Sequence, residues 1–125
     1  MPGFIPHFIA GNAMFFLGSY YIQHHTQLEY TKKNMLLLYI ICIGCSIIPD
    51  FPLALYYGLH VGSFEALVKP HAFFHFIISP LAVLFFIILD LFHPVKKRPL
   101  WIIGILCIIL HIIMDALIEE TGIWI

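Results

Sequence analysis

Four apolar runs, each close to the length of a membrane-spanning helix, follow one another along the chain. Crossing the hydrocarbon core of a bilayer takes about 20 residues of helix. The runs cover residues 4–22, 35–59, 72–92 and 100–118, and short polar connectors join them. The pattern predicts an all-α fold, an integral membrane bundle of four transmembrane helices, which forms a single domain over residues 1–125.

A carboxylate and several prolines interrupt these runs. Asp50 lies in the second run between Pro49 and Pro52, and Pro80 lies in the third run. Charge at bilayer depth is costly and usually functional, and proline removes a backbone hydrogen bond from the helix. Irregular backbone inside a membrane is tolerated only where protein or a polar cavity covers it. We therefore expect Asp50 to face the interior of the bundle, and Pro80 to distort the third helix.

Counting residues along each run places the remaining polar side chains at one depth. At about 1.5 Å of rise per residue, Asp50 lies roughly 22 Å along the second run, and Asp115 lies roughly 22 Å along the fourth. Because successive spans alternate in direction, these positions share a level with the starts of the first and third runs. The residues at this level are His7, Asp50, His71, His75, His111 and Asp115.

The spacing of these residues gives the helices polar stripes. His71 and His75 are four residues apart, as are His111, Asp115 and Glu119, so each set lies on one helix face. Imidazole and carboxylate are the ligands of catalytic zinc sites. A bound ion also offsets the free-energy cost of burying a carboxylate. We therefore expect the six residues at this level to bind a divalent metal, most simply zinc. Asp115 or Glu119 could then act as a general base.

Composition supports a membrane location and excludes one class of partner. The chain is 62% hydrophobic and 10% charged, with a mean hydropathy of +0.98, whereas soluble domains carry about 25% charged residues. A net charge of −1 gives no basic surface for nucleic acid. The expected partners are membrane lipid and a lipid-like substrate, and the sequence leaves the oligomeric state open.

Basic residues predict the orientation. Lys32, Lys33, Lys96, Lys97 and Arg98 lie in the first and third connectors, and both tails lack lysine and arginine. By the positive-inside rule these connectors face the cytoplasm. We therefore expect a multi-pass protein of the cell membrane with its N- and C-termini outside.

The cysteines allow two interpretations. Cys42 and Cys45 have the C-x-x-C spacing of redox and metal motifs, and Cys107 is expected at a similar depth. They could form a membrane dithiol, or they could be small residues at a helix contact. We favour packing, because a soluble redox partner would not reach that depth.

Several of these residues also follow a recognisable order: His7, Pro49, Asp50, His71, His75, Ser79, His111, Asp115 and Gly122. Over nearly the whole chain this order resembles the LexA-regulated, inner-membrane-associated metal-dependent hydrolases of bacteria and archaea. Their motifs are an N-terminal histidine, Pro-Asp-x-Asp, His-Arg-Gly-x-Thr-His-Ser and His-x-x-x-Asp. The resemblance implies a metal-dependent hydrolase with these ligands: His7, Asp50, His75, His111 and Asp115.

The chain departs from the family pattern at two motifs. Pro52 replaces the second aspartate, and the third motif is reduced to residues 70–76, with its histidines one residue closer. His71 is therefore a shifted equivalent at most, and we expect one metal ion more readily than two. The His111-x-x-x-Asp115 step is also similar to helical zinc phospholipases C, which implies an ester or phosphoester substrate.

Two other functions fit the same residues. His75 and His111, on different helices, could ligate a haem in an electron-transfer protein, although the nearby carboxylates suit a harder metal. A non-catalytic membrane subunit could also retain the metal site. Each histidine taken alone is equally compatible with a residue of the membrane interface.

Overall fold

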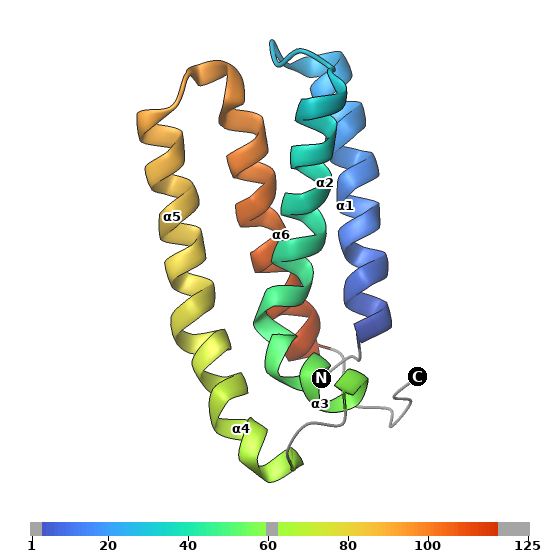
Figure 1. The fold of residues 1–125 in the computed structure, drawn as a ribbon. Coiled ribbons are helices and arrows are strands. Elements are labelled where there is room, and N and C mark those ends of the chain that lie inside the picture. Colours follow the sequence, from blue (N-terminus) through green and yellow to red (C-terminus); the bar gives the residue numbers. More distant parts are fainter. Residues whose placement is uncertain (1–3, 60–62, 118–125) are drawn as a thin grey trace.

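The computed structural model describes residues 4–59 and 63–117, and these residues form an all-α fold without strands, as predicted. The elements are α1 (Phe4–His25), α2 (Lys32–Ile47), a 3₁₀ turn η1 (Ile48–Asp50), α3 (Phe51–Leu59), α4 (Phe64–Phe73), a π-helical turn η2 (Phe74–Ile78), α5 (Ser79–Phe92), a 3₁₀ turn η3 (Val95–Lys97) and α6 (Arg98–Leu117). Four long helical rods, formed by α1, by α2, by α4 with η2 and α5, and by α6, run side by side (Figure 1).

Three of these rods are long and apolar enough to cross a membrane, over Lys32–Asp50, Lys69–Phe92 and Val95–Leu117. They correspond to the second, third and fourth predicted spans. The fourth rod, α1, has 22 residues but is less apolar and is not among the three. The prediction of four spans is thus supported for three helices.

The second predicted run is interrupted at the prolines, as expected from the sequence. The run 35–59 does not form one straight helix, because α2 ends at Ile47 and the chain turns through η1 into α3. Pro49 and Pro52 cause this break, since neither has an N–H group to continue the α-helical ladder. In Figure 1, α3 lies across the end of the bundle instead of continuing the direction of α2.

The third predicted run lies within a longer helical segment that contains a π turn. Its helix starts at Phe64, where the Ser63 hydroxyl accepts a hydrogen bond from the backbone N–H of Ala66. The N–H of Ser79 donates to the carbonyl of Phe74, five residues back, just before Pro80. Proline lacks an N–H and clashes with the carbonyl four residues before it, so the distortion expected at Pro80 is the π turn η2.

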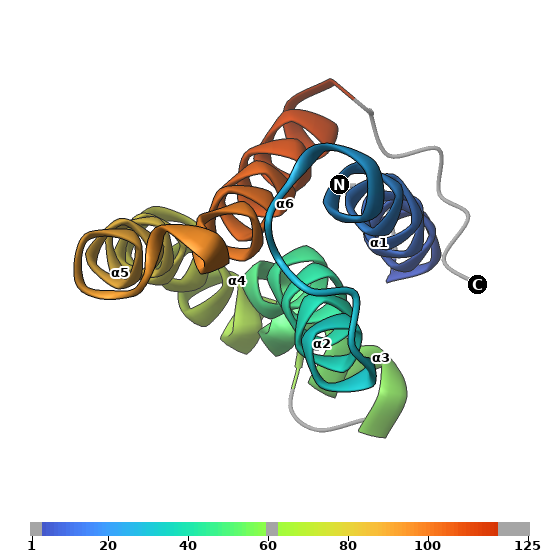
Figure 2. The ribbon, with the colours of Figure 1, turned by 90° about the horizontal axis from the view of Figure 1, so that it is seen from above.

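The core lies between α1, α2 and α6, and α5 packs on α6 at the edge of this group (Figure 2). Its buried side chains include Ile22, Leu38, Ile41, Phe86, Leu100, Trp101, Ile103 and Ile108, together with the three cysteines. Cys42, Cys45 and Cys107 are free thiols in this core. Their burial agrees with a packing role.

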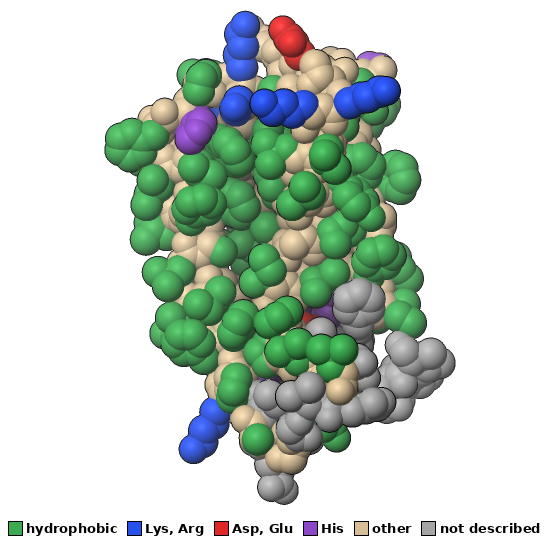
Figure 3. All heavy atoms as spheres, viewed as in Figure 1, with side chains coloured by type: hydrophobic (Ala, Val, Ile, Leu, Met, Phe, Trp, Pro, Cys, Tyr) green, Lys and Arg blue, Asp and Glu red, His purple; other side chains and the backbone are tan. Residues whose placement is uncertain are grey.

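Outward-facing side chains are apolar around the middle of the bundle. Large hydrophobic side chains on the exterior include Ile9, Phe16, Leu17, Leu36, Ile40, Phe76, Leu91 and Ile109. Figure 3 shows this apolar belt, with most of the lysine and arginine side chains at the end where the α1–α2 and α5–α6 connections lie and one at the opposite end. An apolar belt with charge at its edge is typical of a protein surrounded by lipid.

Candidate metal centre

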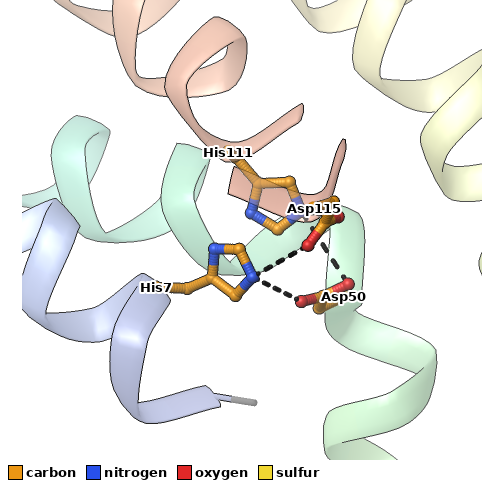
Figure 4. A group of neighbouring side chains, drawn as sticks. All are labelled: His7, Asp50, His111 and Asp115. Carbon is orange, nitrogen blue, oxygen red and sulfur yellow. Dashed lines mark hydrogen bonds and ion pairs between the residues drawn. The ribbon is translucent and has the colours of Figure 1, made fainter. Parts of the chain in front are cut away.

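The six predicted metal ligands meet at the end of the bundle opposite the basic connections. They come from five elements: His7 from α1, Asp50 from η1, His71 from α4, His75 from η2, and His111 and Asp115 from α6. Figure 4 shows four of them, with the two carboxylates facing the rings of His7 and His111. Residues up to 108 positions apart in the sequence are therefore in direct contact.

Imidazole nitrogens surround both carboxylates at short range. The Nε2 atom of His7 lies 3.2 Å from Oδ2 of Asp50 and 3.1 Å from Oδ1 of Asp115. The Nε2 atom of His75 lies 3.2 Å from Oδ1 of Asp50 and 3.3 Å from Oδ2 of Asp115. The Nε2 atom of His111 lies 3.2 Å from Oδ2 of Asp115. In a tetrahedral zinc site with bonds of about 2.0–2.1 Å, neighbouring ligand atoms lie roughly 3.3 Å apart, so these separations suit a shared ion.

Close packing of α1 on α2 brings His7 to the carboxylates. Gly11, one turn after His7, touches α2 so closely that an added Cβ would lie 3.0 Å from Oγ of Ser46 and 3.1 Å from the carbonyl oxygen of Cys42. A larger residue would hold the helices apart. The small residue at position 11 therefore sets how far His7 reaches.

The break in the second span positions Asp50. Asp50 is the last residue of η1, and both Asp50 and Pro49 are buried. The turn packs against η2, which carries His75. Two irregular segments thus face each other inside the bundle, where protein covers their backbone as a membrane requires.

A backbone carbonyl fixes the orientation of His111. The Nδ1 atom of His111 lies 2.9 Å from the carbonyl oxygen of Ser46, which can only accept, so Nδ1 carries a hydrogen and donates it. In the neutral imidazole, Nε2 then presents a lone pair toward Oδ2 of Asp115, which is also an acceptor. Two facing acceptors repel each other unless Nε2 is protonated or a cation lies between them, and a histidine ligand is commonly oriented by such a second bond.

Several buried polar atoms in the cluster have no hydrogen-bond partner. Among the described residues, these atoms include Nε2 of His111, Oδ2 of Asp115, Nδ1 of His7 and both ring nitrogens of His71. Leaving such groups unpaired costs about 1–3 kcal/mol each. A bound cation would satisfy His111 and Asp115 directly, and the chemistry of this donor set therefore fits a divalent metal.

Two groups of possible ligands share Asp50. In the first, one donor atom from each of His7, Asp50, His111 and Asp115 lies within 4.8 Å of every other. In the second, Asp50 joins His71 and His75 in the same way. His71 is the more distant member, with Nδ1 3.6 Å from Oδ1 of Asp50. His71 is therefore part of the cluster.

Other polar residues singled out in the sequence bond to backbone carbonyls or lie outside the described residues. Ser79, four residues after His75, donates from Oγ to the carbonyl of Phe74. His93, at the basic end, makes a hydrogen bond with the carbonyl oxygen of Leu89. Glu119, the second predicted base, lies outside the described residues.

The sequence interpretation missed the backbone carbonyl of Ser46. Ser46 acts on the site through its main chain. A sequence signal did exist, because Pro49 ends the helix and the last carbonyls of a helix need partners from elsewhere.

Comparison of the chain with protein-family models, with curated proteins and with solved structures gives no match.

Proposed function

We propose that this protein is a membrane-embedded, metal-dependent hydrolase. The ion, most simply zinc, is held by His7, Asp50, His111 and Asp115, with His75 beside both carboxylates and His71 as a further ligand. The cluster geometry supports this proposal, because imidazoles and carboxylates converge at distances that fit one shared ion. The motif resemblance to the LexA-regulated membrane hydrolases points to the same residues.

The reaction is the attack of water on an ester or phosphoester. A divalent ion bound here supplies a Lewis acid that makes water more acidic near neutral pH. The carboxylate oxygen of Asp115 that does not bind the ion accepts the proton of the attacking water, and Glu119, four residues further along the sequence, is the alternative base. The water oxygen bonds to the acyl carbon or phosphorus, the bond to the leaving oxygen breaks, and the proton passes to that oxygen.

A fourth span, formed by α1, completes the proposed membrane topology. A helix of 22 residues is roughly 33 Å long, enough to cross the hydrocarbon core. It runs beside α2 (Figure 1) and turns Ile9, Phe16 and Leu17 outward. With the basic connections in the cytoplasm, both termini and the metal site lie toward the outside. The substrate is then a lipid or another ester held at the outer leaflet.

The observation that carries the proposal is that two acceptor atoms, Nε2 of His111 and Oδ2 of Asp115, face each other at 3.2 Å. If an ion joins them, detergent-purified protein contains stoichiometric metal by elemental analysis. We expect His111→Ala and Asp50→Ala each to lose most of this metal, whereas His93→Ala, at the opposite end, retains it. Retention of the metal in both site variants would rule out the site.

The two alternatives lead to different measurements. The rings of His75 and His111 have centroids 5.2 Å apart, and those of His7 and His111 stack at 4.0 Å, which leaves little room for a macrocycle between them. A Soret band in the absorption spectrum would nevertheless favour electron transfer. Stoichiometric metal without hydrolysis of any carboxylic or phosphoric ester would favour a non-catalytic subunit.

A further inference from the structure

A second candidate site lies at the other end of the bundle, between α1 and α6. A cavity of about 630 Å³ opens there, within the range of about 300–1,000 Å³ typical of small-molecule sites. It lies along the second half of α1 and the first half of α6, away from the metal-binding cluster. The residues of its apolar wall are Met14, Leu17, Gly18, Ile102, Ile103 and Leu106.

This cavity is open toward the surroundings of the bundle. Leu17, Ile102 and Leu106 line it and are 65%, 46% and 47% exposed. Near its inner wall α1 and α6 come into contact, because a Cβ added to Gly18 would lie 3.0 Å from Ile103. The cavity is therefore an apolar groove in the seam between two rods. In a bilayer the material available to fill such a groove is a lipid acyl chain.

Two cationic side chains, Lys96 and Arg98, line the groove at the end where basic residues gather, and the imidazole of His25 also lines it. Arg98 donates from Nε to Oδ1 of Asp90 at 2.8 Å, so its charge is already compensated. Lys96 is exposed, and no ion pair joins it to a carboxylate among the described residues. Lys96 is thus the positive charge that remains available at the rim.

We propose that this groove binds one anionic phospholipid of the leaflet at the basic end. An acyl chain lies against Leu17, Ile102 and Leu106, and the phosphate lies beside Lys96 and His25. Apolar wall and cationic rim together match a molecule with an acyl chain and a negative headgroup, and a zwitterionic lipid matches the rim less well. The bound lipid joins α1, the least apolar rod, to α6. This site is independent of the proposed metal chemistry.

The test is the lipid content of the protein after reconstitution. Wild-type protein is incubated in equimolar phosphatidylglycerol and phosphatidylcholine vesicles, extracted in mild detergent and analysed by mass spectrometry. We expect phosphatidylglycerol to be retained in preference to phosphatidylcholine. Lys96→Gln should reduce this preference roughly fivefold, the effect of one lysine beside an anionic headgroup. Lys97→Gln removes the same charge from the next residue, which does not line the groove, and should leave the preference unchanged.

A second variant tests the acyl-chain part of the site without changing charge. Leu106→Trp fills the groove and should reduce retention of both lipids, with helical content by circular dichroism as the control for folding. Equal loss in Lys96→Gln and Lys97→Gln would show only a general attraction of anionic lipid to this end. That result, or unchanged retention in Leu106→Trp, would overturn the proposal.

Discussion

Gly11 is the residue that allows α1 to bring His7 to the carboxylates. Its Cα lies against the backbone of α2, and the nearest atom that cannot move aside is the carbonyl oxygen of Cys42. His7 itself is only 1% exposed and contacts both Asp50 and Asp115. A small displacement of α1 would therefore change the position of His7 relative to its two partners.

We expect Gly11→Ala to destabilise the protein and to weaken its hold on metal. Although alanine favours helix over glycine by about 1 kcal/mol, forcing a methyl against the α2 backbone should cost about 1–3 kcal/mol. Thermal unfolding in detergent and the metal remaining after dialysis against a chelator measure the two effects.

Gly44→Ala is the matched control, because its added Cβ meets only Cδ1 of Ile48 at an ordinary 3.7 Å. This variant should match or exceed the wild type in stability and keep its metal. Identical behaviour of the two alanine variants would show that contact at Gly11 does not set the site.

At the scale of elements, two irregular turns each contribute one residue to the polar site, and the regular helices α1, α4 and α6 contribute the other four. Asp50 lies in the 3₁₀ turn η1 and His75 in the π turn η2, and the two turns contact each other. A π turn inserts one residue into the helix and rotates the part before it by about 100° relative to the part after it. The direction in which His75 points thus depends on η2.

We expect Pro80→Ala to weaken metal binding by roughly tenfold, comparable to the loss of a residue that orients a ligand. Restoring the N–H at position 80 allows a regular α-helix, which would turn His75 away from Asp50 and Asp115. A competition titration with a chromogenic chelator measures the affinity.

Pro99→Ala serves as the comparison for this change. Pro99 is the second residue of α6, where a missing N–H breaks no helical hydrogen bond. It should leave the metal affinity unchanged. Wild-type affinity in Pro80→Ala would mean that packing alone maintains the π turn.

At the scale of the whole molecule, the two ends of the bundle carry different kinds of polar residue. One end holds the basic residues of the connections and the proposed lipid groove, and the other holds the histidine–aspartate cluster. An apolar belt lies between them. This division predicts that the two ends are on opposite sides of the membrane, with the basic end in the cytoplasm.

Single cysteines test this orientation in a background with Cys42, Cys45 and Cys107 changed to alanine. Ala66 and Gln23 are exposed at opposite ends. A membrane-impermeant maleimide should label Ala66→Cys in intact cells and Gln23→Cys only after permeabilisation. The reverse pattern would invert the proposed topology. Labelling of both in intact cells would contradict a membrane crossing between them.

An N-terminal epitope tag adds a test of α1. If α1 spans the membrane, the tag is accessible to antibody in intact cells while Gln23→Cys remains protected from the maleimide. Protection of both would place α1 on the cytoplasmic side and reduce the number of spans to three.

The sequence alone determined the all-α class and the set of residues that meet. Helical rise is nearly constant, so counting along each apolar run predicted the common depth of Asp50, His111 and Asp115 before any contact was known. The prolines likewise predicted that the second and third helices would be irregular. Local rules were sufficient for these features because they depend on spacing along one helix.

Only the tertiary structure decided where α3 turns and that the carbonyl of Ser46 orients His111. Proline removes a hydrogen bond but does not specify the direction in which the chain continues. That direction depends on contacts between distant residues, such as the bond from His111 to a carbonyl 65 positions earlier. The lipid groove has the same origin, since it exists only where α1 and α6 separate.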